Sequence, residues 1–132
     1  MSESVSRSPK PATAQTRQAN ADAVAQLPMS DRRDFDDASR GFIATLDDPL
    51  IRRADGVPVF DLSAHDFLKA TDDAPDTVHP SLWWHAQVNN HHGLFEVTDG
   101  IYQVRGFDMS NITIVEGDEG IIVIDPLIYN DG

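Results

Sequence analysis

The sequence has 132 residues, 40% of them hydrophobic and 24% charged, as is typical of one soluble globular domain. The absence of cysteine excludes a disulfide scaffold, a cysteine-ligated zinc site and thiol catalysis. The 22 acidic and 10 basic residues give a formal net charge of −12, which argues against partners such as nucleic acids and anionic membranes, because phosphate groups repel such a surface.

Residues 1–30 are predicted to form a leader that is disordered or weakly helical. Residues 1–18 are rich in Ser, Thr, Ala, Pro and Gln, which bury too little apolar surface to offset the entropy lost on ordering. A weak helical pattern follows from Gln18 to Leu27. The chain shows neither an apolar secretory segment nor an apolar run of about 18 residues. We therefore expect no membrane span and a cytoplasmic location, or a periplasmic one if the start is misassigned.

Residues 31–93 are predicted to be a helical segment that contains a small hairpin. A first helix is predicted from Asp31 to Leu46, with Asp31 as its cap. Its apolar residues recur at three- and four-residue spacing, namely Phe35, Ala38, Phe42 and Leu46. The turn signal Ala54-Asp55-Gly56 then predicts a hairpin over residues 50–60.

Two further helices are predicted in the same segment. Ser63 and Asp66 resemble a capping box for a short helix that ends at Ala70. Pro80 suits the first turn of another helix, which closes near Gly93. This helix carries Trp83 and Trp84, which point about 100° apart. We expect one of the two indole rings to pack in the core and the other to lie at an interface or groove.

Residues 94–132 change to a β pattern. Two hairpins, over residues 94–105 and 111–124, predict a four-stranded meander, so the fold class is α+β. The strand Ile121–Ile124 is apolar at every position, whereas a strand with one wet face alternates. We therefore expect both faces of this strand to be covered, by the rest of a larger layered fold or by a dimer partner.

Three polar residues near strand ends are candidate site residues. Asp125 follows the fully apolar strand and precedes Pro126, and sites of layered α/β folds gather at the carboxyl ends of strands. The alternative for Asp125 is a simple Asp-Pro turn. Asp108 and Asn111 lie in the loop that joins the hairpins, where they either cap backbone groups or border a site. Ser110 has no visible base, so a nucleophilic role is disfavoured.

His85, His91 and His92 lie on or just after the tryptophan helix. Positions 85 and 92 are seven residues apart, so the sequence predicts that they share a helix face. A metal is conceivable there, but the local sequence offers no carboxylate or third ligand at a suitable spacing. Surface or helix-end histidines are the favoured interpretation, and we assign neither a metal ligand nor a catalytic residue.

Two collinear blocks of sequence carry a resemblance to a known family. The first comprises Pro80-Ser81-Leu82-Trp83, Ala86-Gln87, Asn89-Asn90 and Gly93-Leu94-Phe95-Glu96-Val97. The second comprises residues 100–106, Asp108, Ser110-Asn111, Glu116-Gly117 and Ile124-Asp125-Pro126-Leu127. Over about residues 31–132 the chain resembles the N-terminal portion of the bacterial alkyl/aryl-sulfatases, which have a metallo-β-lactamase catalytic domain.

This resemblance implies that residues 94–132 are the truncated start of an incomplete metallo-β-lactamase-type αβ/βα sandwich. It implies a two-zinc enzyme that hydrolyses alkyl sulfate esters, such as dodecyl sulfate, to alcohol and sulfate, and that is a homodimer when complete. The H-x-H-x-D-H motif that begins the family's metal ligands is missing, so no zinc ligand is assigned. We therefore expect this chain alone to bind no zinc and to be inactive.

The resemblance also bears on the candidate site residues. Asp125 corresponds to a strand-end aspartate that supports the site without binding metal, and Asp108 and Asn111 correspond to a loop at the site edge. Two alternatives stay open at this point. One is another hydrolase of the metallo-β-lactamase fold, and the other is a non-catalytic acidic module for binding or assembly.

Overall fold

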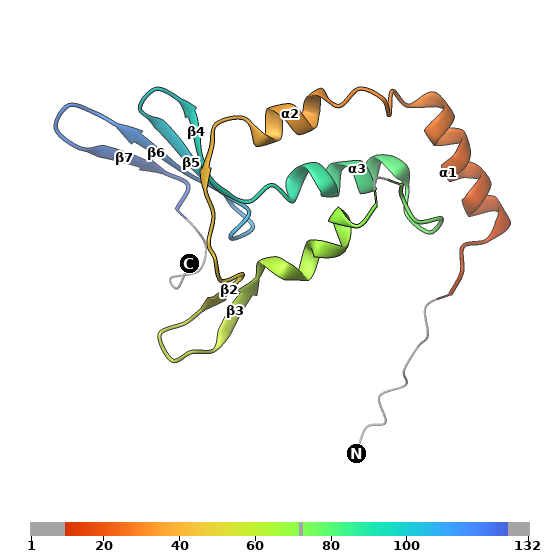
Figure 1. The fold of residues 1–132 in the computed structure, drawn as a ribbon, viewed down its shortest axis with the longest axis horizontal. Coiled ribbons are helices and arrows are strands. Elements are labelled where there is room, and N and C mark those ends of the chain that lie inside the picture. Colours follow the sequence, from red (N-terminus) through yellow and green to blue (C-terminus); the bar gives the residue numbers. More distant parts are fainter. Residues whose placement is uncertain (1–9, 72, 127–132) are drawn as a thin grey trace, which may run out of the picture.

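The computed structural model describes residues 10–71 and 73–126, and it places a group of helices beside an antiparallel sheet (Figure 1). The helices are α1 (Ala14–Gln26), α2 (Arg33–Ser39), the 3₁₀ helix η1 (Leu62–Lys69) and α3 (Pro80–Asn89). The strands are β1 (Phe42–Ala44), β2 (Leu50–Arg52), β3 (Pro58–Asp61), β4 (Gly93–Thr98), β5 (Ile101–Arg105), β6 (Ile112–Glu116) and β7 (Ile121–Ile124). The predicted mixture of helices and antiparallel strands is confirmed. No helix among these residues is long and apolar enough to cross a membrane.

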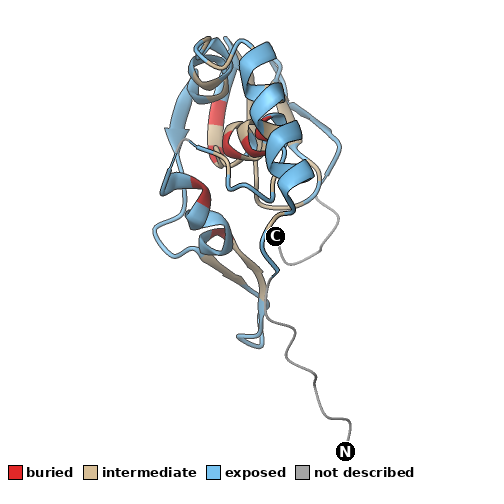
Figure 2. Cartoon of the chain, turned by 90° about the vertical axis from the view of Figure 1, so that its right-hand side faces the viewer, coloured by how far each residue is buried: buried red, intermediate tan, exposed pale blue. Residues whose placement is uncertain are grey.

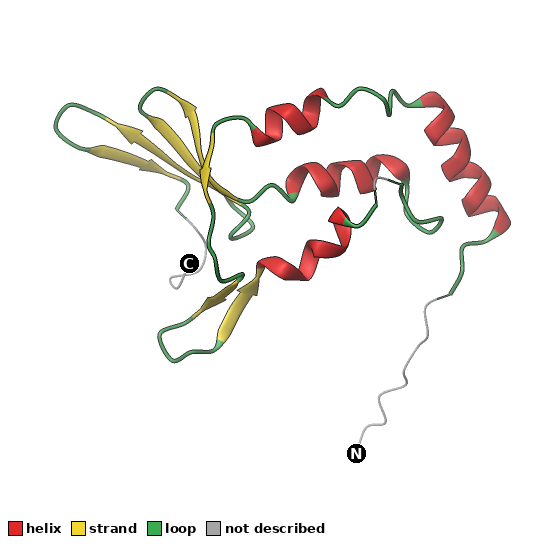
Figure 3. Cartoon of the chain, in the orientation of Figure 1, coloured by secondary structure: helices red, strands yellow, loops and turns green. Residues whose placement is uncertain are grey.

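The main sheet contains the predicted meander and one strand more. Its order is β1-β4-β5-β6-β7, and all neighbouring strands are antiparallel. The two predicted hairpins, β4–β5 and β6–β7, are therefore confirmed. The hairpin predicted over residues 50–60 is also confirmed, as the separate two-stranded sheet β2–β3 (Figure 3).

The first helix begins earlier than the sequence predicted. Thr13 Oγ1 accepts a hydrogen bond from the Thr16 backbone N–H at 3.1 Å, and this cap starts α1 at Ala14. The expectation of disorder was therefore wrong for residues 14–18, while residues 1–9 lie outside the described part. Helix α1 buries none of its side chains, but Asn20 Nδ2 donates to the carbonyl oxygens of Asp76 and Val78 at 2.9 and 3.1 Å.

The helix predicted from Asp31 to Leu46 was wrong in its second half. Helix α2 ends at Ser39, and Gly41 adopts a φ of +72°, which a right-handed helix does not allow. Residues Phe42–Ala44 then form β1, whose Phe42 lies opposite Phe95 of β4. Pairing with β4 has therefore overridden the helical spacing of the apolar residues.

The next two helices agree only in part with the sequence-based expectation. The Ser63 backbone N–H donates to Asp61 Oδ1 at 2.9 Å, so Asp61 caps η1 and the predicted Ser63–Asp66 capping box does not form. Pro80 starts α3 as predicted, and His79 Nδ1 accepts a hydrogen bond from the Ser81 backbone N–H. Helix α3 ends at Asn89, four residues before Gly93.

The buried residues lie on η1, α3 and β4 (Figure 2). The buried apolar residues of the core are Leu62, Leu68, Trp83 and Phe95, and Phe95 is the most deeply buried. Gln87 joins the two helices, because its Nε2 donates to the carbonyl oxygens of Leu68 and Thr71, both at 2.9 Å. Trp83 thus occupies the core position that the sequence predicted for one of the two tryptophans.

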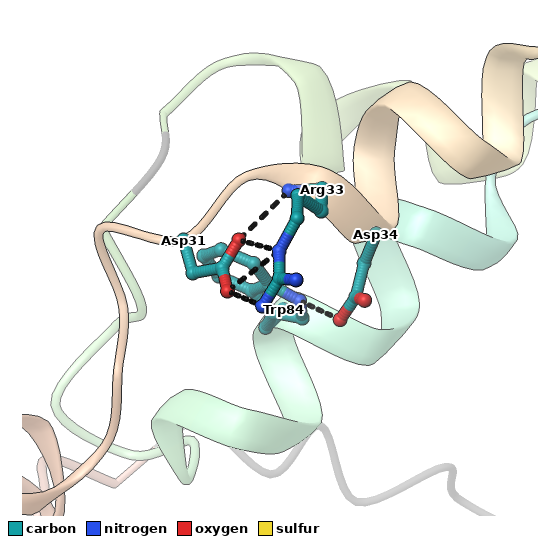
Figure 4. Close-up of polar contacts among 4 residues, drawn as sticks. All are labelled: Asp31, Arg33, Asp34 and Trp84. Atoms are coloured by element: carbon teal, nitrogen blue, oxygen red, sulfur yellow. Dashed lines mark hydrogen bonds and ion pairs between the residues drawn. The ribbon is translucent and has the colours of Figure 1, made fainter.

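The second tryptophan lies at an interface between helices. Trp84 Nε1 donates to Asp34 Oδ2 at 3.2 Å (Figure 4). The Trp84 ring also meets Phe35 edge-to-face, with the centroids 4.8 Å apart. The neighbouring Asp31 accepts hydrogen bonds from the side chain and the backbone of Arg33, which lower the pKa of Asp31 to about 2. The contacts of Trp84 with Asp34 and Phe35 hold α2 against α3.

Strand β7 is exposed on both faces in this chain. Its four residues, Ile121–Ile124, keep between 47% and 64% of their surface accessible. The sequence predicted that other parts of a structure pack against both faces of β7, but residues 10–71 and 73–126 do not do so. The second sheet and outer helices of the predicted sandwich therefore stay a prediction.

A candidate site at the loop between β5 and β6

The candidate site lies at one edge of the main sheet. The loop of residues 106–111 leaves β5 after Arg105 and enters β6 at Ile112. Because Ile124 pairs with Thr113, the residue after β7 reaches the edge at which β6 begins. The sequence-predicted Asn111 and Asp125 are thus brought to the same edge of the sheet.

Glycine is required where this loop starts. Gly106 has a φ of +78°, and a Cβ atom there would lie only 2.6 Å from His92 Cβ. The missing side chain lets the loop pass directly beside His92. The His92 ring is held by a 2.9 Å hydrogen bond between its Nδ1 and Thr45 Oγ1, so the loop rests against a fixed neighbour.

A cavity of about 400 Å³ opens between this loop and the two helices α2 and α3. Residues from three separate parts of the fold line it, including Ala38, Asn89, His91, Arg105, Asp108 and Asn111. A second cavity, of about 290 Å³, shares Asn89, Gly106 and Asp108 with the first and is otherwise lined mainly by apolar side chains of β3, η1 and α3. The loop therefore borders two hollows of different character.

The structure brings together two of the three predicted site residues. Asp108 and Asn111 line the 400 Å³ cavity, and Asp108 Oδ1 accepts a hydrogen bond from the Met109 backbone N–H at 2.5 Å. Asp125 is exposed and lies outside the lining of this cavity, with an unusual φ of +51°. A catalytic or supporting role for any of them stays a prediction.

Ser110 differs from its neighbours in the same loop. Its Oγ is buried and has no hydrogen-bond partner among the described residues. No base lies within hydrogen-bonding distance of that oxygen among the described residues, so none of them activates it as a nucleophile.

The histidines do not form the arrangement that the sequence suggested. His92 lies beyond the end of α3 at Asn89, so the prediction that His85 and His92 share a helix face was wrong. His85 is exposed and is hydrogen-bonded to Asn89 through its Nε2 at 3.3 Å. In the described ranges, no group of three or more His, Asp or Glu side chains is placed to hold a metal ion. These residues therefore do not fit a zinc centre, and we derive no step through a metal.

Partial burial lowers the pKa values of His91 and His92 below the ordinary value of 6.5. The positive charge of Lys69 lowers both further. The folded chain therefore binds protons at these rings less readily than the unfolded chain does.

We accordingly expect the free energy of unfolding to fall as the pH drops below 6.5, because protons then favour the unfolded state. Replacing His91 by glutamine is expected to flatten this fall. Urea unfolding at pH 8.0 and at lower pH measures the effect, and the same substitution at the exposed His85 is the control. Equal pH dependence of the free energy of unfolding in the H91Q and unmodified chains would show that His91 does not contribute to the loss of stability at low pH.

Sequence reasoning missed one residue of the site, Arg105. The signal was present, because Arg105 is the only Lys or Arg after Lys69, in a stretch that holds 11 acidic residues. A single positively charged side chain in such an acidic segment is a candidate for binding an anion. The polar pattern that predicted a site covers residues 106–111 and does not include Arg105, the last residue of the preceding strand.

Comparisons with known proteins show which proteins this chain resembles. No family model matches it. It is 50% identical over 122 residues to a linear primary-alkylsulfatase of Pseudomonas, and 50% identical over 118 residues to an (R)-specific secondary-alkylsulfatase of Pseudomonas. It is also 47% identical over 116 residues to the alkyl/aryl-sulfatase BDS1 of Saccharomyces cerevisiae. These matches cover 88% to 92% of this chain.

The fold agrees with that class. The structure of the stereoselective inverting sec-alkylsulfatase Pisa1 from Pseudomonas superposes with a TM-score of 0.79 over 88% of this chain, and a double mutant of the same protein gives 0.78. The chain spans 18% of the length of these relatives. It is thus homologous to part of the alkyl/aryl-sulfatases, which are sulfuric ester hydrolases, and the predicted family resemblance is confirmed.

Proposed function

We propose that this chain is the N-terminal portion of a zinc-dependent alkylsulfatase that hydrolyses alkyl sulfate esters, such as dodecyl sulfate, to alcohol and sulfate. The observation that best supports the proposal is an identity of about 50%, together with a TM-score of 0.79, over nearly the whole described chain. The names of the relatives include primary and secondary alkylsulfatases, so alkyl sulfates are the first substrates to test.

Within such an enzyme, we assign the chain a supporting role. The described residues do not fit a metal centre, so the proposal places the zinc ions on residues outside this chain. Residues 106–111, with Asp108 and Asn111 on a cavity wall, are suited to border a substrate site. The homodimer and the metallo-β-lactamase sandwich are further parts of the proposal, and they rest on the sequence resemblance. The cytoplasmic location is also proposed, and it rests on the lack of an apolar secretory segment in residues 1–20.

Hydrolysis of dodecyl sulfate tests the proposal directly. We expect the purified 132-residue chain to release no sulfate above the buffer rate, with or without added zinc, because residues 10–71 and 73–126 provide no metal site. Ion chromatography of free sulfate is the measurement. Chelator-sensitive release by the chain alone would show that the chain is catalytic after all.

The complete protein is the matching sample for this experiment. Reading the coding DNA beyond the Gly132 codon provides its sequence, and the expressed product is expected to release sulfate in a chelator-sensitive reaction. Failure of the complete protein to release sulfate from primary or secondary alkyl sulfates would refute the proposed activity.

A further inference from the structure

Arg105 is held in a fixed orientation at the end of β5. Its guanidinium carbon lies 4.4 Å from the centroid of the Phe95 ring, and Phe95 is the most deeply buried large side chain described. Arg105 Nε donates to Gln103 Oε1 at 2.7 Å, and Gln103 Nε2 in turn donates to Thr113 Oγ1 at 3.2 Å. A ring platform and a chain of side-chain hydrogen bonds thus aim the guanidinium before any ligand arrives.

The outer nitrogens of this guanidinium are left without a partner in the described structure. Its Nη1 and Nη2 make no hydrogen bond there, and no described carboxylate forms an ion pair with Arg105. Arg33 and Lys69, by contrast, pair with Asp31 and Asp66 respectively. In a chain of net charge −12, a half-buried arginine that avoids every described carboxylate keeps its charge available for another anion.

Uncharged donors surround the same hollow. Asn89 and Asn111 line the 400 Å³ cavity together with Arg105, and each carries an amide NH₂ group; one N–H of Asn89 is engaged by His85 Nε2, which leaves the other for a ligand. His91 also lines the cavity, and its depressed pKa keeps the ring neutral near pH 7, so it offers one N–H. These donors suit an oxygen-rich anion better than a cation.

One acidic group also lines the cavity. Asp108 places its carboxylate on the same wall, where its charge repels an anion. Part of that carboxylate is engaged, since Oδ1 accepts the Met109 backbone N–H. Asp108 therefore weakens anion binding without forming an ion pair with the guanidinium. Removal of its charge should strengthen anion binding.

We propose that Arg105 anchors an oxyanion subsite that takes the sulfate group, either of the ester or of the released product. The planar guanidinium can donate two parallel N–H···O bonds to a tetrahedral oxyanion, and the amides of Asn111 and Asn89 complete the donor set. The choice of sulfate rests on the proposed function, whereas the oxyanion subsite rests on the geometry of this chain.

Titration of the 132-residue chain with sodium sulfate, followed by two-dimensional NMR at constant ionic strength, tests the subsite. We expect saturable shifts centred on the amides of residues 105, 106 and 111. In the R105Q variant the affinity is expected to fall at least about tenfold, because a charged hydrogen-bond donor is lost. The R105K variant is expected to retain part of the affinity, since it keeps the charge and loses the planar fork.

Two further variants separate binding from a purely structural effect. D108N removes the opposing charge and keeps a side-chain acceptor for Met109, so it is expected to bind sulfate more tightly. R40Q alters an exposed arginine that pairs with Asp37, and it is expected to bind sulfate as the unmodified chain does. The amide spectrum of each variant shows whether it is folded. Unchanged affinity in R105Q and R105K, or the same shifts with chloride alone, would overturn the subsite.

The outcomes also distinguish this subsite from the proposed function. Hydrolysis of alkyl sulfates by the complete protein without Arg105-dependent sulfate binding would refute the subsite and leave the proposed function in place. Arg105-dependent binding of sulfate, together with a complete protein that hydrolyses no alkyl sulfate, would keep the oxyanion subsite and refute the proposed activity.

Discussion

The substitution of alanine for Gly41 is expected to lower the free energy of unfolding by about 3 kcal/mol, through backbone strain and a steric clash. Gly41 has a φ of +72°, and an added Cβ would lie 2.0 Å from the carbonyl oxygen of Glu96. To relieve that clash, β1 must move away from β4. The movement breaks the 2.8 Å hydrogen bond from the Glu96 N–H to the Gly41 carbonyl oxygen. Urea unfolding followed by tryptophan fluorescence measures the loss.

Gly56 is the matched control for this substitution. It has a φ of +85°, but no atom lies within 4 Å of the position where its Cβ would be. G56A therefore carries the strain of the left-handed backbone without a clash, and it is expected to cost about 1 kcal/mol. Equal losses in G41A and G56A would show that the close approach of β1 to β4 does not contribute to stability.

Gly41 also explains where sequence-based prediction of the fold failed. The apolar residues from Phe35 to Leu46 follow helical spacing, and nothing local shows that Phe42 lies opposite Phe95, which is 53 residues away in the sequence. The Arg40-Gly41 step was a weak stop signal that the periodicity outweighed. A strand that forms only through distant pairing is invisible to a local pattern.

The elements that were predicted correctly have strong signals within a few residues. Asp99-Gly100 marks the β4–β5 turn, and Gly100 adopts the φ of +70° that such a turn needs. Pro80 similarly marks the start of α3, because its fixed φ suits the first helical turn. Where turn and cap chemistry is local, the sequence determines the boundary to within a few residues.

The candidate site, like the fold, was only partly predictable from the sequence. Asp108 and Asn111 are three residues apart in one loop, so their shared position was predictable from the sequence. The cavity between them and the helices was not, because Ala38, Asn89 and Arg105 come from α2, α3 and β5. The exposure of β7 was equally hidden, since a run of apolar residues predicts a need for cover and does not reveal whether this chain supplies it.

The substitution of alanine for Phe95 is expected to lower the free energy of unfolding by about 3–5 kcal/mol, as is usual when a buried aromatic ring is removed. Only 1% of Phe95 is accessible, and its ring meets that of Phe42 edge-to-face with the centroids 5.5 Å apart. The same ring supports the guanidinium of Arg105. The deletion therefore leaves a cavity at the point where β1, β4 and β5 come together.

Phe67 is the control for Phe95, because it has the same side chain but is 57% exposed on η1. F67A is expected to cost less than about 1 kcal/mol, since little apolar surface returns to water. Urea unfolding of both variants tests the difference, and similar losses would show that the core is not centred on Phe95. In sulfate titrations of the folded variants, F95A is expected to bind more weakly than F67A, because only Phe95 supports the guanidinium of Arg105. Stability of the sheet and recognition of the anion would then depend on the same aromatic ring.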